Sequence, residues 1–187
     1  MIDPATNPNG ETFQDYNQRR WGGSGWTHNL KKQGQQDDLG ANFQNWKWWP
    51  NTLNAHRFIW YVCHNSNQNS LDTSTANEIL FEAIYEQGDN VSLPETLVKI
   101  GTTHPLLAGK YSQKDLTSFL SSQDGIAQVQ KEIQHGKRQY QISSVPFFII
   151  EPAKASKEDS QLRRPYGISG AQQTQTFLNI FEELSNK

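Results

Sequence analysis

Apolar residues recur at helical spacing in the middle of the chain. From Thr52 to His64 they return every three or four positions, which predicts a helix with one face in a core. A second apolar segment covers Ile79–Tyr85. It follows Thr75-Ala76-Asn77-Glu78, the pattern of a capping box, and precedes Gly88, a residue suited to a left-handed helix end. Both segments are predicted helices.

Three further helices are predicted from their capping residues. Ser92-Leu93-Pro94-Glu95 opens a short helix through Ile100, with proline in the first turn, where its missing N–H costs nothing. The other two are expected near 113–121, after the cap Ser112, and near 125–137, after the cap Asp124.

The hydrophobic period changes after Tyr140. The run Val145–Ile150 is β-branched and aromatic and predicts a buried strand, with Pro146 at its beginning because proline cannot donate to a ladder. Tyr166–Gly170 is a second strand candidate, so these segments form at most a two-stranded sheet. One helical stripe near the carboxyl end holds Phe177, Leu178, Phe181 and Leu184.

The length of 187 residues indicates one domain with three parts. Residues 1–50 are rich in proline, glycine and amides and are expected to be an irregular arm, with one helix near Glu11–Trp21 that stops at Gly22-Gly23. Residues 51–137 form the helical part. Residues 138–187 carry a proline loop, a hairpin and a closing helix.

Composition excludes several classes of function. The 17 basic and 19 acidic residues leave a net charge of -2, which makes nucleic acid an unexpected partner. No apolar window reaches the roughly 20 residues of a membrane span, so no membrane partner is expected. Cys63 is the single cysteine, so the chain cannot form an internal disulfide, and a cytoplasmic location is expected. The histidine spacing predicts no metal site.

Short segments along nearly the whole chain together resemble one family. They are Ile2–Pro4, Gly23–Thr27, Asn45–Thr52, Ala55–Arg57, Val145–Ile149 and Ile168–Gln172. In this order they resemble the DsbA-like thioredoxin family, in particular its FrnE-type branch, which is related to hydroxychromene carboxylate isomerases and kappa-class glutathione transferases.

The resemblance implies an α/β, thioredoxin-like fold with a helical insertion. It also implies that the family's first strand, Cys-x-x-Cys helix and second strand are missing before Met1. The family function is thiol–disulfide exchange with a thiol- or disulfide-bearing protein or peptide, or a glutathione-linked reaction with glutathione as the possible cofactor. Cys63 lies on the apolar face of a predicted helix without a partner thiol, so this chain is expected to be inactive as a dithiol oxidase.

Val145 and Pro146 are the first candidate binding residues. The resemblance implies a cis bond between them, which leaves the preceding backbone edge open to an extended substrate, whereas an ordinary trans proline at a strand start is the alternative. Ser169 and Gly170 lie beside this loop in the family and are expected to line the same groove. A simple turn before the last helix explains them equally well.

Trp46, Trp48 and Trp49 offer flat faces to an aromatic or sugar ligand, although such residues more often wedge an arm against a core. Asn51 and His56 could bind a substrate carboxylate or accept a proton, with a helix cap and an ordinary helix histidine as alternatives. A non-catalytic module that binds a peptide or small molecule therefore stays open beside the enzyme. Self-association through the open strand edge is also expected.

Overall fold

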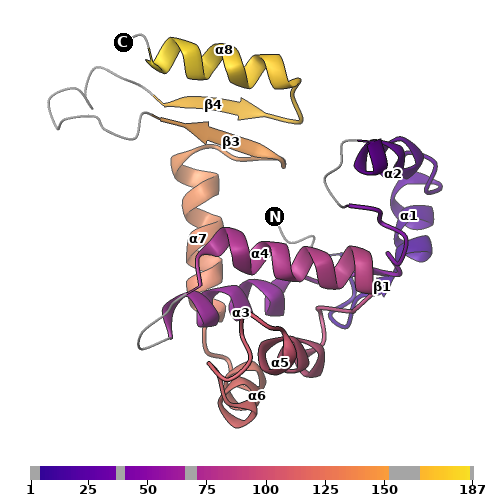
Figure 1. Cartoon of the computed structure of the whole chain (residues 1–187), viewed down its shortest axis with the longest axis vertical. Coiled ribbons are helices and arrows are strands. Elements are labelled where there is room, and N and C mark those ends of the chain that lie inside the picture. Colours follow the sequence, from indigo (N-terminus) through magenta and orange to yellow (C-terminus); the bar gives the residue numbers. More distant parts are fainter. Residues whose placement is uncertain (1–4, 37–40, 66–70, 152–164, 186–187) are drawn as a thin grey trace, which may run out of the picture. The chain divides into compact units, whose positions relative to one another are not determined.

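The computed structural model describes residues 5–36, 41–65, 71–151 and 165–185. The chain divides into two compact units, a larger unit, Ile2–Val129, and a smaller unit, Gln130–Lys187. Figure 1 labels their helices and strands. The boundary lies inside a helix, α7, Ile126–Gln139.

The larger unit is mainly helical. It contains β1 Glu11–Thr12, α1 Phe13–Trp21, α2 Thr27–Gln36, β2 Trp48–Trp49, α3 Leu53–His64, α4 Thr73–Phe81, the π-helix η1 Glu82–Gln87, α5 Pro94–Thr103 and α6 Gln113–Ser121. The two short strands pair antiparallel, with Glu11 opposite Trp49. No helix in the described part of the chain is long and apolar enough to cross a membrane.

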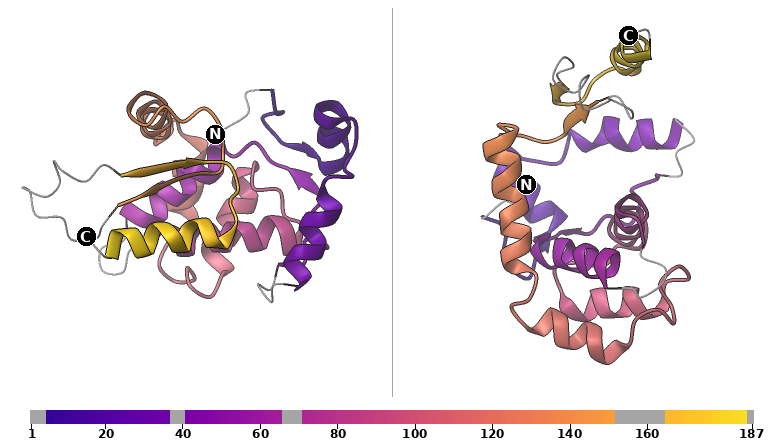
Figure 2. Two further views of the ribbon diagram at one scale, coloured as in Figure 1. Left: turned by 90° about the horizontal axis from the view of Figure 1, so that it is seen from above. Right: turned by 90° about the vertical axis from the view of Figure 1, so that its left-hand side faces the viewer.

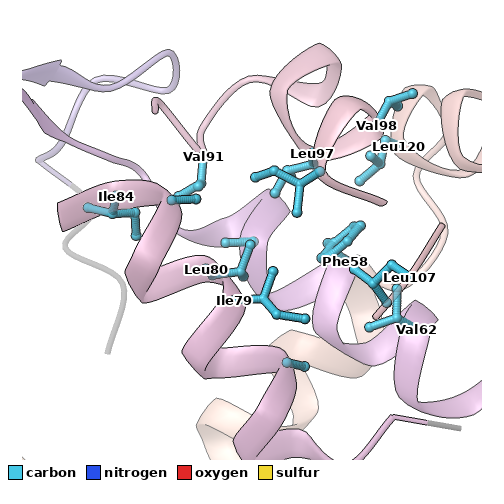
Figure 3. Packing of buried hydrophobic residues seen from close by; sticks show 14 of the residues in the cluster. Phe58, Val62, Ile79, Leu80, Ile84, Val91, Leu97, Val98, Leu107 and Leu120 are labelled. Atoms are coloured by element: carbon cyan, nitrogen blue, oxygen red, sulfur yellow. The ribbon is translucent and has the colours of Figure 1, made fainter. Parts of the chain in front are cut away.

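The core of the larger unit comes largely from helices that apolar spacing or capping residues predict. Figure 3 shows the packing of this cluster of buried residues. Phe58 and Val62 of α3 and Leu97 of α5 are at most 1% exposed. Because the burial of such side chains dominates folding free energy, these helices define the stable centre of the unit.

The amino-terminal segment is more regular than the sequence predicts. The expected helix before Gly22 is present as α1, but α2 and the β1–β2 pair were not expected. The sequence of α2 is mostly polar, and its burial rests on small residues, Thr27 and Gly34. Leu30 of α2 packs against the core, and a Cβ atom at Gly34 would collide with the carbonyl oxygen of Ala41, so this close backbone approach requires glycine.

Two predicted caps are wrong. Thr75 does not begin α4; the carboxylate of Asp72 caps it and accepts hydrogen bonds from the Thr75 N–H (3.0 Å) and hydroxyl (2.6 Å). A charged acceptor upstream is favoured at the positive end of a helix. Ser92 does not cap α5 either, because its buried hydroxyl accepts from the backbone N–H of Asn51 (2.8 Å).

Other helix boundaries are confirmed. Ser112 caps α6, with its hydroxyl accepting from the Asp115 N–H at 3.0 Å. Pro94 is in the first turn of α5, and Gly88, with φ 75°, ends the helical segment of α4 and η1. Proline and glycine mark these boundaries through their own backbone preferences, whereas serine caps one predicted helix and not the other.

The smaller unit contains the end of α7, a hairpin and one further helix. Strands β3, Phe147–Ile150, and β4, Tyr166–Ser169, pair antiparallel, and α8, Thr174–Ser185, lies along the hairpin (Figure 2). The Phe148 and Phe177 rings are 4.9 Å apart at their centroids. The two-stranded sheet and closing helix are confirmed, and the protein is a mixed structure of helices and small sheets.

Candidate functional site

The predicted proline loop is present beside the hairpin. The Val145–Pro146 bond is cis, as expected, and the Val145 side chain is 62% exposed. The N–H of Gly170 donates to the carbonyl oxygen of Pro146 at 2.8 Å. The hydroxyls of Ser144 and Ser169 are 3.1 Å apart. Ser169 and Gly170 therefore lie next to the loop.

Asn51 and His56, the other two predicted binding residues, lie in the larger unit. The Asn51 side chain accepts from the N–H of Leu53 (3.1 Å) and donates to the carbonyl of Thr6 (3.4 Å), so the expected capping role accounts for its polar atoms. His56 is exposed on α3. Neither residue lines the pocket described below.

Any thiol chemistry of this chain would have to use Cys63, its single cysteine. Its side chain is half-buried on α3, and burial raises the pKa of the thiol; Asp72 adds to this, while a hydrogen bond from Thr73 opposes it. A raised pKa keeps the sulfur protonated and therefore a poor nucleophile. Among the described residues, no group of three or more His, Cys, Asp and Glu is arranged to hold a metal ion.

Of the three tryptophans singled out in the sequence, Trp46 is the most deeply buried. It is 9% exposed, its indole N–H donates to the carbonyl of Trp48 (2.9 Å), and its ring lies 4.4 Å from Phe13 and 4.9 Å from Tyr85. The wedge interpretation is confirmed for Trp46. Trp49 instead borders an open pocket.

This pocket is lined by three indoles and a glycine-rich loop, and we call it the tryptophan pocket. Its lining residues are Trp21, Gly22, Gly23, Gly25, Trp26 and Trp49. Its volume of about 660 Å³ falls within the range of small-molecule sites. It lies in the larger unit, where α1 ends and α2 begins.

Buried contacts hold two of the indoles in place. The indole N–H of Trp26 donates to Oδ1 of Asn17 at 2.7 Å, and Nδ2 of Asn17 donates to the carbonyl of Phe13 at 2.7 Å. Asn17 is 0% exposed. Trp49 is stacked on Tyr16, with 3.9 Å between ring centroids and an interplanar angle of 6°. These contacts fix the ring orientations before any ligand arrives.

The loop between the helices is also fixed. The N–H of Gly22 donates to the Gln18 carbonyl at 3.1 Å and that of Gly23 to the Asn17 carbonyl at 3.2 Å. Gly22 has a φ of 71°, which favours glycine. The hydroxyl of buried Thr27 donates to the carbonyl of Ser24 at 2.7 Å. The pocket is thus built on a defined turn.

Two of the lining indoles are unusually exposed. Trp21 is 59% exposed and Trp26 is 45% exposed. The guanidinium carbon of Arg20 lies 5.0 Å from the centroid of the Trp21 ring. From the sequence, this segment was interpreted as a helix stop and as part of the family resemblance, and neither Trp21 nor Trp26 was assigned to a site. The available signal was a pair of tryptophans on either side of Gly22–Gly25.

A second hollow, of about 480 Å³, lies between α5 and α6. Thr102 and Thr103 line it, but their hydroxyls donate to carbonyls of their own helix, at Val98 and Lys99. It has no aromatic lining. These two hydroxyls are therefore already engaged within α5, and the hollow offers no aromatic face to a planar ligand.

Comparisons of the chain with protein-family models, with curated proteins and with solved structures found no match. The assignment of function therefore rests on the geometry of the candidate sites.

Proposed function

We propose that this protein is a non-catalytic binding module that holds a small planar molecule in the tryptophan pocket. The observation that carries the proposal is the set of three indoles around a glycine loop, two of them exposed, in a pocket of about 660 Å³. Indoles provide large apolar faces, and stacked aromatic pairs gain about 0.5–1.5 kcal/mol beyond the area that they bury.

The fixed geometry of the pocket supports the same proposal. Trp26 is held by Asn17, and Trp49 by its stacking on Tyr16. A site that is already ordered loses little side-chain freedom when a ligand binds, so more of the stacking energy remains as affinity. A planar ring that covers Trp21 and Trp26 would also remove exposed apolar surface from water.

Thiol–disulfide exchange and glutathione binding stay predictions of the family resemblance. Exchange between a dithiol and a disulfide needs a thiolate and a second thiol within reach. The chain has one cysteine, and burial raises the pKa of that thiol, Cys63. Binding without covalent chemistry is the function that these residues support best.

Titration with naphthamide, a neutral planar probe, tests the proposal. We expect saturable binding by calorimetry, accompanied by shifts of the indole N–H resonances of the pocket in proton–nitrogen NMR spectra. Trp21→Ala removes an exposed lining ring and should weaken binding about tenfold. Because Trp21 is exposed, the variant should keep the fold, which circular dichroism checks.

Phe81→Ala is the matched control, since Phe81 is a 53% exposed aromatic residue on α4 that does not line the pocket. It should bind naphthamide as the parent protein does. Absence of saturable binding, or equal affinities in the parent and Trp21→Ala, would overturn the proposal.

A further inference from the structure

We infer that the planar ligand of the tryptophan pocket carries a carboxylate, which Arg20 recognises. This inference rests on the proposed function and adds the charge of the ligand to it. In the described part of the chain, some of the charged groups around the pocket form ion pairs within the fold, and others do not.

Arg19 and Arg20 are neighbours on α1 with different surroundings. The guanidinium of Arg19 forms an ion pair with Glu11 at 2.7 Å, so its charge is neutralised within the fold. Arg20 lies over the ring of Trp21, a lining residue, and has no ion pair with any described carboxylate. Arg20 is therefore a cation beside the pocket that no carboxylate in the described part of the chain neutralises.

The nearby acidic side chains do not cancel this charge. Residues 5–36 include two carboxylates, Glu11 and Asp15. Glu11 is paired with Arg19, and Asp15 accepts the hydroxyl hydrogen of Thr12 at 2.7 Å in the cap of α1. Both carboxylates are thus engaged in local bonds at the start of α1, whereas Arg20 is in its last turn.

The partial charges of the helix ends at the pocket do not decide the sign of the ligand's charge. α1 ends at Trp21 with its partially negative carbonyl end, and α2 begins at Thr27 with its partially positive N–H end. These two partial charges oppose each other across a short loop. The full charge of Arg20 therefore dominates, and a guanidinium can bind a carboxylate through two parallel hydrogen bonds.

The ligand class that fits is a flat aromatic ring bearing a carboxylate. The ring stacks on the indoles, and the carboxylate reaches the guanidinium beside Trp21. A planar amine would instead place a second cation next to Arg20, and like charges repel. An uncharged ring would bind through stacking alone.

Naphthoate and naphthamide form the probe pair, because they share a ring system and differ in charge. We expect the parent protein to bind naphthoate about fivefold more tightly than naphthamide in low salt, the usual scale of an exposed ion pair. This preference should shrink as salt is added, because salt screens exposed charges.

Arg20→Gln should abolish the preference, because the affinity for naphthoate should fall more than the affinity for naphthamide. Lys114→Gln, the same loss of charge on α6, is the matched control and should keep the preference. Equal affinities for the two probes in the parent, or a preference that survives in Arg20→Gln, would overturn this inference while leaving the proposed function intact. If neither probe binds the parent, the proposed function fails and this inference fails with it.

Discussion

At the scale of single residues, Cys63 shows how position controls chemistry. The thiol is on the side of α3, half-buried, with the Thr73 hydroxyl 4.0 Å from its sulfur. Burial raises the pKa of this thiol above its ordinary value. At a pH near that ordinary value, the folded protein therefore holds less thiolate than the unfolded chain.

We expect iodoacetamide to alkylate Cys63 more slowly in the folded protein than in the urea-unfolded chain. The rate in the folded protein should also rise at a higher pH than the rate in the unfolded chain. As the pH rises, the Cys63 thiol loses its proton first in the unfolded chain. The free energy of unfolding therefore falls between the pKa of the unfolded state and the higher pKa of the folded state. Mass spectrometry of quenched time points measures both rates. Equal rates would contradict the suppressed reactivity of Cys63, and faster labelling of the folded protein would show that Cys63 is an activated thiol.

At the scale of elements, Arg57 connects α3 with the end of α6. Its side chain is 2% exposed, and desolvation lowers the pKa of the guanidinium, with Asp124 opposing the shift. Its donors reach five oxygens at 2.8–3.2 Å. The acceptors are Oδ1 of Asn54 and the carbonyls of Phe119, Leu120, Ser122 and Asp124. One side chain thus donates to carbonyls at and beyond the carboxyl end of α6, where helices lack intrahelical donors; the Phe119 carbonyl also accepts from the Ser122 hydroxyl at 2.8 Å.

Arg57→Lys should lower the free energy of unfolding by about 2–4 kcal/mol. The charge remains, but a lysine cannot reproduce the planar fork, and buried carbonyls are left without donors. Urea denaturation followed by circular dichroism measures the change. Lys114→Arg, an exchange at an exposed position of α6, should shift stability by no more than about 0.5 kcal/mol. An unchanged midpoint in Arg57→Lys would contradict this role.

At the scale of the whole molecule, the two units differ in how much they bury. The larger unit has a continuous core around residues such as Phe58 and Leu97. In the smaller unit, none of the described residues from 130 to 185 is fully buried. A two-stranded hairpin with one helix is marginal without a buried face, so the units should differ in local stability.

Hydrogen exchange should therefore be faster in β3, β4 and α8 than in α3 and α5. Mass spectrometry of a dilute sample measures this, and equal protection in both units would contradict it. The expected self-association through the strand edge predicts that protection of β3 and β4 rises with protein concentration. Protection independent of concentration would exclude that association.

The sequence alone determined the elements whose side chains repeat a strong local preference. Apolar spacing predicted α3, β-branched and aromatic residues predicted β3, and Ser112 predicted the start of α6, because these signals act through neighbours in the chain. Asn51 was also weighed as a capping residue; its Oδ1 accepts from the Leu53 N–H at the start of α3, although the N-cap residue is Thr52. Periodicity and capping are local, so they can be identified without knowing the fold.

Only the tertiary structure decided which tryptophans form a site. Trp46 and Trp49 are near neighbours in the sequence, yet one is buried among aromatic rings and the other lines a pocket. Trp26 is oriented by the buried amide of Asn17, and the backbone approaches Gly34 of α2 too closely for any other residue. The role of each tryptophan depends on which side chains surround it and on how deeply it is buried. Both are decided only when the helices and strands pack together.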